Sequence, residues 1–401
     1  MDFYRACLKT SKSYWQRGVS AVRSAIHSLP IIYVLLLSQT TDGSDNNLDK
    51  KVDDCRRKLF GCPSWLLDTW CHSLLLSTRL RDLSNALYDR FEQHGGIEYL
   101  GEAITHYRQL ERFNRYPIGD HNRLTTLSNL AIAVQTRFNQ LGNLDDLEEA
   151  ITCYRQALAL RSHGHPNHSD SLNNLADALS TRFEQLGGIE DLEEAITFYR
   201  QALDLRPHGH PNRSDSLNNL AWEVLTRFEQ LGGMEDLEEV ITCRRQELAL
   251  LPHGHPIDSD SLNSLACAVF FRFEQLGRME DLEEAIASYR QALDLRPHGH
   301  PDRPDFLNNL GNAVSTRFEQ LGRMEDLEEA ITSYRQSLAL LPHGHPDHSS
   351  YLNNLGNTVS TRFRQLGRME DLEEAITCHR QVLVLRPHGH PDHSVSLNNL
   401  A

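Results

Sequence analysis

Residues 171–211 read SLNNLADALSTRFEQLGGIEDLEEAITFYRQALDLRPHGHP, and this stretch decides the fold. Its first half, from Leu172 onward, places apolar residues three or four positions apart, which predicts one buried face of an α-helix. Gly187 and Gly188 interrupt that pattern, and the second half resumes it. The second run ends before Pro207, because the residue before a proline is disfavoured in the α region. The stretch therefore predicts a helix–turn–helix hairpin.

The hairpin recurs along the chain at a constant interval of 45 residues. The first histidine of the HGH tripeptide marks each recurrence: His163, His208, His253, His298, His343 and His388. A fixed interval of this size is typical of stacked repeat proteins. Related sequence extends back to about residue 80, and a further copy begins at Leu397. We therefore expect seven hairpins and the beginning of an eighth.

These units resemble tetratricopeptide repeats. The positions of the quoted stretch that match the family are Leu172, Leu175, Ala176 and Leu179 in the first helix and Ala195, Tyr199, Ala202 and Pro207 in the second. The unit exceeds the usual length of 34 residues, with extra residues around the turn (TRFEQLG) and in the HGHP loop. Lengthened repeats of this sort look like those of kinesin light chain. The repeat sequence is also similar to that of fungal repeat proteins whose longer relatives often carry a caspase-related (CHAT) domain. This sequence does not contain such a domain.

The resemblance implies an all-α fold, a right-handed superhelix of helix pairs (a solenoid) over residues 80–401. Residues 1–79 do not follow the repeat, and we expect them to be a divergent segment that is partly helical or disordered. Their strongest apolar run, LPIIYVLLL at 29–37, has nine residues. A membrane-spanning helix needs about 20, so no membrane span is predicted.

The composition favours an intracellular scaffold. The formal net charge is −15, with 55 acidic and 40 basic residues, which disfavours a nucleic acid partner because such proteins need a basic surface. Eight cysteines in 401 residues are too few for a disulfide framework, so free thiols in the cytoplasm are expected. A mitochondrial location is the alternative, because residues 3–40 contain basic but no acidic side chains.

An asparagine pair in the LNNL motif is the main candidate site. In tetratricopeptide repeats, the equivalent positions of the first helix line a concave groove that commonly holds peptides. Asparagine carries donors and an acceptor, which suit the alternating C=O and N–H groups of an extended peptide. The predicted groove residues of this kind are Asn129, Asn173, Asn174, Asn218, Asn219, Asn263, Asn308, Asn309, Asn312, Asn353, Asn354 and Asn357. The alternative is that the pairs bridge adjacent helices for stability.

Two adjacent units carry apolar residues where the other units are polar or small. These residues are Trp222, Leu225, Cys267, Phe270 and Phe271. If they face the groove they form an exposed apolar patch, and such patches mark interaction sites. The alternative is that they pack against a neighbouring second helix of a hairpin.

The HGH loops allow three interpretations. Two histidines one residue apart can chelate a metal, but a structural zinc site has four ligands, and a neighbouring loop lies one repeat away. The loops are better explained as spacers, in which Gly299 allows a left-handed backbone and the imidazoles bond within the loop. A response to pH is the third interpretation, since histidine titrates near pH 6.5. No metal site and no cofactor are predicted.

We therefore expect a non-enzymatic scaffold that binds an extended peptide or partner segment in the groove. The sequence contains no P-loop, no dinucleotide-binding glycines, no HExxH and no nucleophile elbow. The alternative function is the regulatory or sensor region of a larger fungal effector protein whose catalytic domain is missing from this chain. Because the last hairpin leaves an apolar face uncovered, self-association through it is a further expectation.

Overall fold

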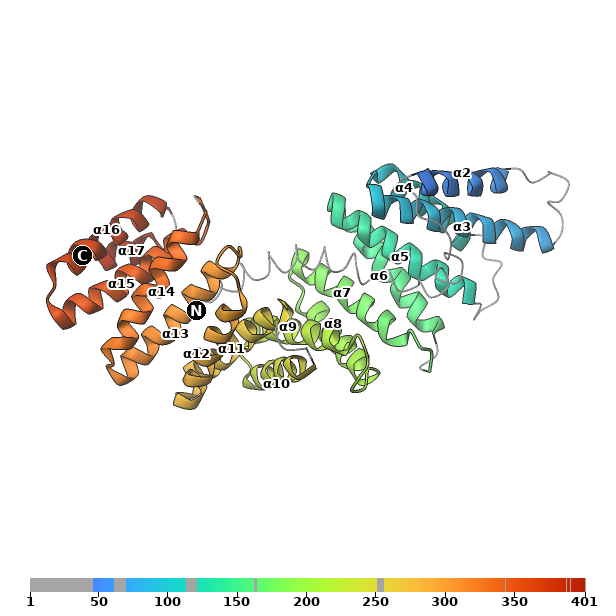
Figure 1. Cartoon of the computed structure of the whole chain (residues 1–401). Helices are drawn as coiled ribbons and strands as arrows, with labels where there is room; N and C mark the ends of the chain where they lie inside the picture. Colours follow the sequence, from blue (N-terminus) through green and yellow to red (C-terminus); the bar gives the residue numbers. More distant parts are fainter. Residues whose placement is uncertain are drawn as a thin grey trace. The chain divides into compact units, whose positions relative to one another are not determined.

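A computed structural model describes residues 46–60, 70–112, 121–161, 164–250, 256–342, 344–386, 388–389 and 391–400. Within these ranges the regular secondary structure is entirely α-helical (Figure 1), which confirms the predicted fold class. None of the described helices has the length and apolar character needed to cross a bilayer. The apolar run at 29–37 lies outside the described residues.

The helices alternate between a first helix (A) and a second helix (B) of each hairpin. A preceding helix is α2 (Asn46–Phe60). The A helices are α3 (Trp70–His94), α5 (His121–Leu141), α7 (His168–Leu186), α9 (Arg213–Leu231), α11 (Pro256–Leu276), α13 (Arg303–Leu321), α15 (His348–Leu366) and α17 (His393–Leu400). The B helices are α4 (Ile97–Arg112), α6 (Leu144–Leu160), α8 (Ile189–Asp204), α10 (Met234–Leu250), α12 (Met279–Leu295), α14 (Met324–Leu340) and α16 (Met369–Leu385).

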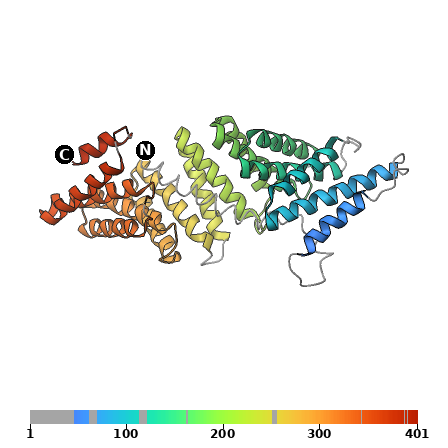
Figure 2. The ribbon, with the colours of Figure 1, turned by 90° about the horizontal axis from the view of Figure 1, so that it is seen from above.

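The chain divides within α9 into two compact units. The described part of the N-terminal unit runs from Asn46 to Glu223, and that of the C-terminal unit from Val224 to Leu400. In the C-terminal unit α11 packs on α12, α13 on α14 and α15 on α16, and each B helix also contacts the next A helix (Figures 1 and 2). The N-terminal unit repeats this order from α3 to α7 and α8. The predicted hairpins are therefore present in both units.

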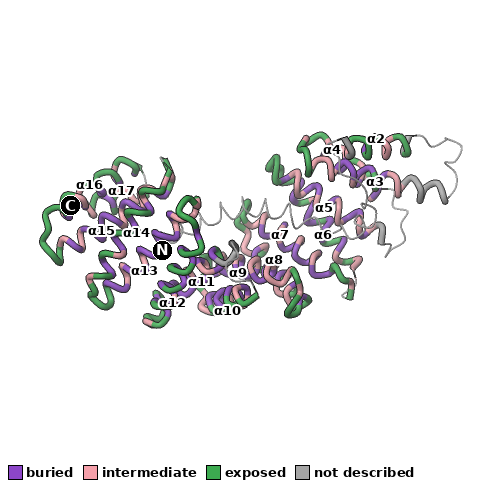
Figure 3. The backbone as a smooth tube through the Cα atoms, in the orientation of Figure 1, coloured by how far each residue is buried: buried purple, intermediate pink, exposed green. Residues whose placement is uncertain are grey.

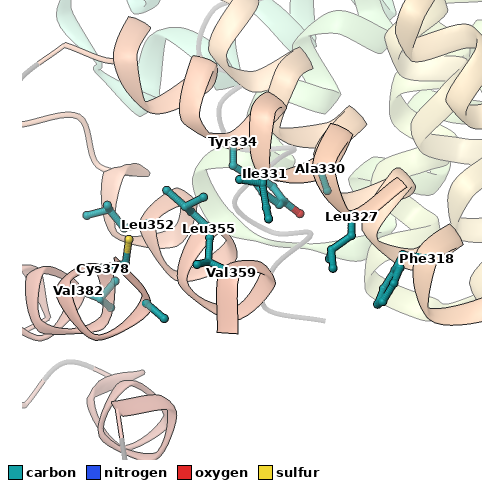
Figure 4. Packing of buried hydrophobic residues seen from close by; sticks show 11 residues of the cluster. Phe318, Leu327, Ala330, Ile331, Tyr334, Leu352, Leu355, Val359, Cys378 and Val382 are labelled. Carbon is teal, nitrogen blue, oxygen red and sulfur yellow. The ribbon is translucent and has the colours of Figure 1, made fainter. Parts of the chain in front are cut away.

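Each hairpin buries the apolar stripe that its sequence predicts (Figure 3). In the C-terminal unit Tyr334 of α14 lies at 2% exposure beside Ile331 and Leu355. Figure 4 shows this cluster, which continues through Val359 to Cys378 of α16. Burying a side chain of this size stabilises the fold by about 1.5–3 kcal/mol. The cluster joins the core of the α13–α14 hairpin to that of the α15–α16 hairpin.

The residues that lengthen the repeat extend helix A. The segment TRFEQL continues α13 to Leu321, where Gly322 ends the helix with a φ of 67°. The Gly322 N–H donates to the Phe318 carbonyl oxygen at 2.7 Å, a left-handed helix end that glycine adopts without a Cβ clash. At the other end, Pro304 lies in the first turn, where its missing N–H costs no hydrogen bond.

An arginine near the end of each long A helix braces the turn. Arg317 donates to Asp326 Oδ1 at 2.6 Å, in the B helix of its own hairpin, and to Glu283 Oε2 at 2.8 Å, in the preceding hairpin. Arg272 and Arg362 each make the same two contacts. The Asp326 side chain is 6% exposed, so these pairs are less screened than surface pairs. These arginines and the acids of the EDLEE segments therefore form a row of ion pairs whose inner aspartate is buried.

Candidate functional site

The asparagine pairs connect successive A helices. The second asparagine of a pair donates from Nδ2 to Oδ1 of the first asparagine in the preceding hairpin. The distances are 3.4 Å for Asn309 to Asn263, 3.1 Å for Asn354 to Asn308 and 2.9 Å for Asn399 to Asn353. In the N-terminal unit Asn129 donates at 3.0 Å to Asn85, which occupies the position that Asn312 has in α13. The pairs therefore bridge adjacent helices, which is the alternative that the sequence left open.

In the α7–α8 and α13–α14 hairpins a tyrosine of helix B bonds to the side chain one helical turn after the asparagine pair. The Tyr334 hydroxyl donates to Asn312 Oδ1 at 2.6 Å, and Asn354 Nδ2 lies 3.4 Å from the same oxygen. In the N-terminal unit the Tyr199 hydroxyl donates to Asp177 Oδ1 at 2.5 Å. The hydroxyl and the neighbouring amide together fix the orientation of Asn312.

Four amides of α13 and α15 keep unused hydrogen-bonding capacity after these bonds are made. Within the described part of the chain, the NH₂ groups of Asn312 and Asn353 and the Oδ1 atom of Asn354 have no partner. Asn357 is exposed, and its side chain also has no partner among the described residues. Asn353 and Asn357 lie one turn apart on the same helix face. We call these four residues the amide face.

The other predicted groove residues differ in burial. Asn308 is fully buried at 0% exposure, and Asn309, Asn173 and Asn263 are buried at 6–8%. Those of intermediate exposure are Asn129, Asn174, Asn218 and Asn219. Asparagines below 10% exposure serve the bridges or the helix packing, so only part of the predicted set can reach a ligand in this conformation.

The expected exposed patch of apolar residues requires a correction. Leu225, Phe270 and Phe271 are buried at 2%, 4% and 7% exposure. The ring of Phe271 lies 5.8 Å from that of Phe228, a distance typical of packed aromatic pairs. Leu225, Phe270 and Phe271 are therefore core residues, because the helices of their hairpins close over them.

The other two residues of that expected patch are only partly covered. Trp222 and Cys267 have intermediate exposure, and the Tyr289 hydroxyl lies 3.3 Å from Cys267 Sγ. Burial raises the pKa of the Cys267 thiol to about 11, so the thiol remains protonated at neutral pH. Neither residue forms an exposed anchor with the buried phenylalanines.

The HGH loops are held by their second histidine. The Asp302 N–H donates to His300 Nδ1 at 3.3 Å, and the Asn212 N–H donates to His210 Nδ1 at 3.2 Å. The imidazole thus accepts from the backbone rather than donating to it. Gly209 has a φ of 89°, but Gly299 has no positive φ, so the left-handed conformation expected for Gly299 is wrong.

No group of three or more His, Cys, Asp or Glu side chains in the described ranges is arranged to hold a metal ion.

A buried arginine at the end of helix B did not follow from the repeat pattern. Arg206 is 2% exposed and donates to Ser169 Oγ at 3.3 Å, Asp170 Oδ1 at 2.5 Å and Ser216 Oγ at 2.5 Å. It therefore joins both helices of its hairpin to the start of the next A helix. Arg296 and Arg386 are buried in the same way. The signal was present in the sequence as an Arg-Pro step before HGH, paired with an acid or serine 36 residues earlier.

Comparison with known proteins supports the repeat assignment. Tetratricopeptide repeat models match residues 137–210, 276–298 and 349–393. The C-terminal part of a TPR repeat-containing protein from Cytophaga hutchinsonii is 13% identical with a TM-score of 0.51, over 79% of this chain and 99% of that chain. No curated protein sequence matches this chain.

Two further solved structures are similar over shorter ranges. Nearly identical TPR-like repeats of a kinesin light chain from Podospora anserina are 22% identical with a TM-score of 0.40, over 55% of this chain and 99% of that chain. YrrB, described as a TPR protein with an unusual peptide-binding site, is 16% identical with a TM-score of 0.39, over 61% of this chain and 96% of that chain.

Proposed function

Because this chain is built of tetratricopeptide repeats, we propose that it is a non-enzymatic scaffold that binds an extended segment of a partner protein along its A helices. The observation that carries the proposal is the amide face: Asn312, Asn353, Asn354 and Asn357 keep donors and acceptors that no described residue uses. An extended peptide offers the complementary C=O and N–H groups.

The orientation of these amides supports binding rather than general polarity. The Tyr334 hydroxyl and Asn354 hold Asn312, and Asn399 holds Asn353. A side chain that is already fixed loses less conformational entropy when a ligand binds. Each amide contact contributes only about 1 kcal/mol net, so the affinity requires several contacts along the segment.

The first experiment identifies a ligand and tests the site. A peptide array selects a binding sequence, and fluorescence polarisation measures its affinity for the wild type and for Asn357→Ala. Loss of an exposed amide contact should weaken binding about 3- to 10-fold, equivalent to roughly 1 kcal/mol. Thr332→Ala on helix B, whose exposed hydroxyl bonds only within its own helix, is the matched control and should leave the affinity unchanged. Equal affinities for the wild type and Asn357→Ala would contradict the proposal.

Ionic strength provides a second, independent test. The amide face carries no charge, so raising the salt concentration from about 0.1 M to 1 M should change the affinity of the selected peptide by less than threefold. Screening of charge pairs would be felt over this range, since the Debye length falls from about 10 Å to 3 Å. A drop of tenfold or more would place the peptide on the charged surface instead.

The regulatory role in a longer protein stays a prediction. It requires an effector domain encoded beyond this sequence, and sequencing of the full transcript tests for one. A transcript that encodes only further repeats or a stop codon would count against that role.

A further inference from the structure

In the α13–α14 hairpin a leucine stands where three other hairpins have a buried arginine, and the α9–α10 hairpin also has a leucine, Leu251, at this position. At the start of three A helices, the equivalent side chains Asp170, Asp260 and Ser350 accept hydrogen bonds from Arg206, Arg296 and Arg386 in turn. The side chain at this place in α13 is Asp305. The residue of that hairpin 36 positions later, where the arginine stands in the other three, is Leu341. Asp305 therefore has a carboxyl in a site built for a carboxylate–guanidinium pair, without the guanidinium.

Asp305 instead bonds to the next hairpin. The Tyr351 hydroxyl of α15 donates to Asp305 Oδ1 at 2.5 Å, which joins the starts of α13 and α15. This is the only hydrogen bond of the Asp305 side chain to the described residues. The Tyr351 ring is 3% exposed and Asp305 has intermediate exposure, so the bond is partly buried in the junction.

The charged groups that act on Asp305 are carboxylates. Asp302 precedes α13 and Asp347 precedes α15, and both raise the pKa of Asp305. The cations nearby are directed elsewhere: Arg296 contacts Asp302 at 3.1 Å, and His345 lies 3.8 Å from Asp347. No described cation therefore offsets the charge of an ionised Asp305.

Two further contacts complete the surroundings of this carboxyl. The Arg303 guanidinium donates to the carbonyl oxygens of Leu293 and Arg296. From α14, the Ser337 hydroxyl donates to the Pro304 carbonyl oxygen at 2.7 Å. Both polar groups are engaged by the backbone, so neither balances a negative charge on Asp305.

We propose that Asp305 makes the junction between the α13–α14 hairpin and the α15–α16 hairpin a pH-sensitive latch, which holds while the carboxyl is protonated and loosens when it ionises. Burial raises the pKa of Asp305 to about 7; Asp347 and Asp302 add to the rise, and the hydrogen bond from Tyr351 opposes it without cancelling it. In the unfolded chain the pKa of an aspartate is near 4. The stabilisation by the bound proton is therefore fully present below pH 4 and is lost as the pH rises through 7.

Hydrogen exchange measures the latch directly. Exchange of amides in α13 and α15 through local opening, corrected for the intrinsic pH dependence of exchange, reports the fraction of open junction. Between pH 5 and pH 8 this fraction should rise roughly 10- to 100-fold, as the shift of the pKa from near 4 to about 7 requires.

Two variants and a control separate the latch from other titrations. Asp305→Asn removes the proton site and should make the opening independent of pH over this range. Leu341→Arg supplies the guanidinium that Arg206, Arg296 and Arg386 provide in three other hairpins, and it should keep the junction as protected at pH 8 as at pH 5. Asp170→Asn, which removes a carboxyl that already has its arginine, should leave the pH dependence of α13 and α15 unchanged.

The carboxyl itself provides the decisive check. Carbon NMR of ¹³C-labelled aspartate in the wild-type protein should show one carboxyl that titrates near pH 7 and is absent from Asp305→Asn. If that variant does not fold, the wild-type titration alone decides. The proposal is overturned if all aspartates in the native protein titrate below about pH 5, or if Asp305→Asn retains the wild-type pH dependence.

Discussion

At the scale of single residues, the same side-chain type has different roles at adjacent positions. Asn308 is fully buried and accepts from Asn354, whereas Asn357 is exposed and has no side-chain partner in the described part of the chain. Burial of an amide without partners costs about 1–3 kcal/mol, and the bonds of Asn308 to Asn354 and of Asn309 to Asn263 offset part of that cost. The exposed amide remains available to a ligand.

Tyr334→Phe tests how far the core orients the amide face. The change removes only the hydroxyl that donates to Asn312 Oδ1 at 2.6 Å, so the ring packing is kept. It should lower the free energy of unfolding by about 1 kcal/mol. It should also weaken binding of the selected peptide, because Asn312 loses one of its two fixed partners. Urea denaturation and fluorescence polarisation measure the two effects. An unchanged affinity would show that the orientation of Asn312 does not matter for binding.

At the scale of elements, the long A helices bring each turn against the preceding hairpin. An arginine in the last turns of α13 contacts acids in two B helices, α12 and α14. Its side chain is 10% exposed, whereas that of Arg335, which pairs with Glu374, is 47% exposed. The two arginines therefore make the same kind of pair in different surroundings.

Arg317→Ala and Arg335→Ala form a matched pair. Loss of Arg317 leaves the buried Asp326 without its guanidinium, and removing one partner of a buried pair costs about 3–5 kcal/mol, with the lower end expected for this partly buried group. Loss of Arg335 should cost less than about 1 kcal/mol, since exposed pairs contribute little. Urea denaturation of the two variants compares them. Similar losses would show that the turn brace is no stronger than a surface pair.

At the scale of the whole molecule, the period of 45 residues was enough to predict the hairpins, because a periodic apolar stripe must be buried by its neighbours. The places of Pro304 and of the glycines that end the A helices followed from the same pattern. The exposure of single residues could not be predicted from the period. Phe270 and Phe271 are apolar at positions where the other repeats are polar or small, and both are buried. The repeat period alone does not determine whether such a side chain points to solvent or into the core.

The candidate site was predictable only in part for the same reason. The repeat placed the asparagines on A helices, but it did not show that Asn309, Asn354 and Asn399 bond to the preceding pair. The arginine of the junctions was missed because its partners lie 36 residues before and 10 residues after it. Its replacement by Leu341 became informative only when the contacts of the other hairpins were known.

The most direct test of the scaffold function is a hydrogen-exchange footprint of the selected peptide on the intact protein. Bound peptide should slow the exchange of amides in α13 and α15, which carry the amide face, and should leave the B helices α14 and α16 unchanged. Asn357→Ala should show no footprint at a peptide concentration below the dissociation constant of that variant for the peptide. Protection confined to B helices or to the HGH loops would contradict the account.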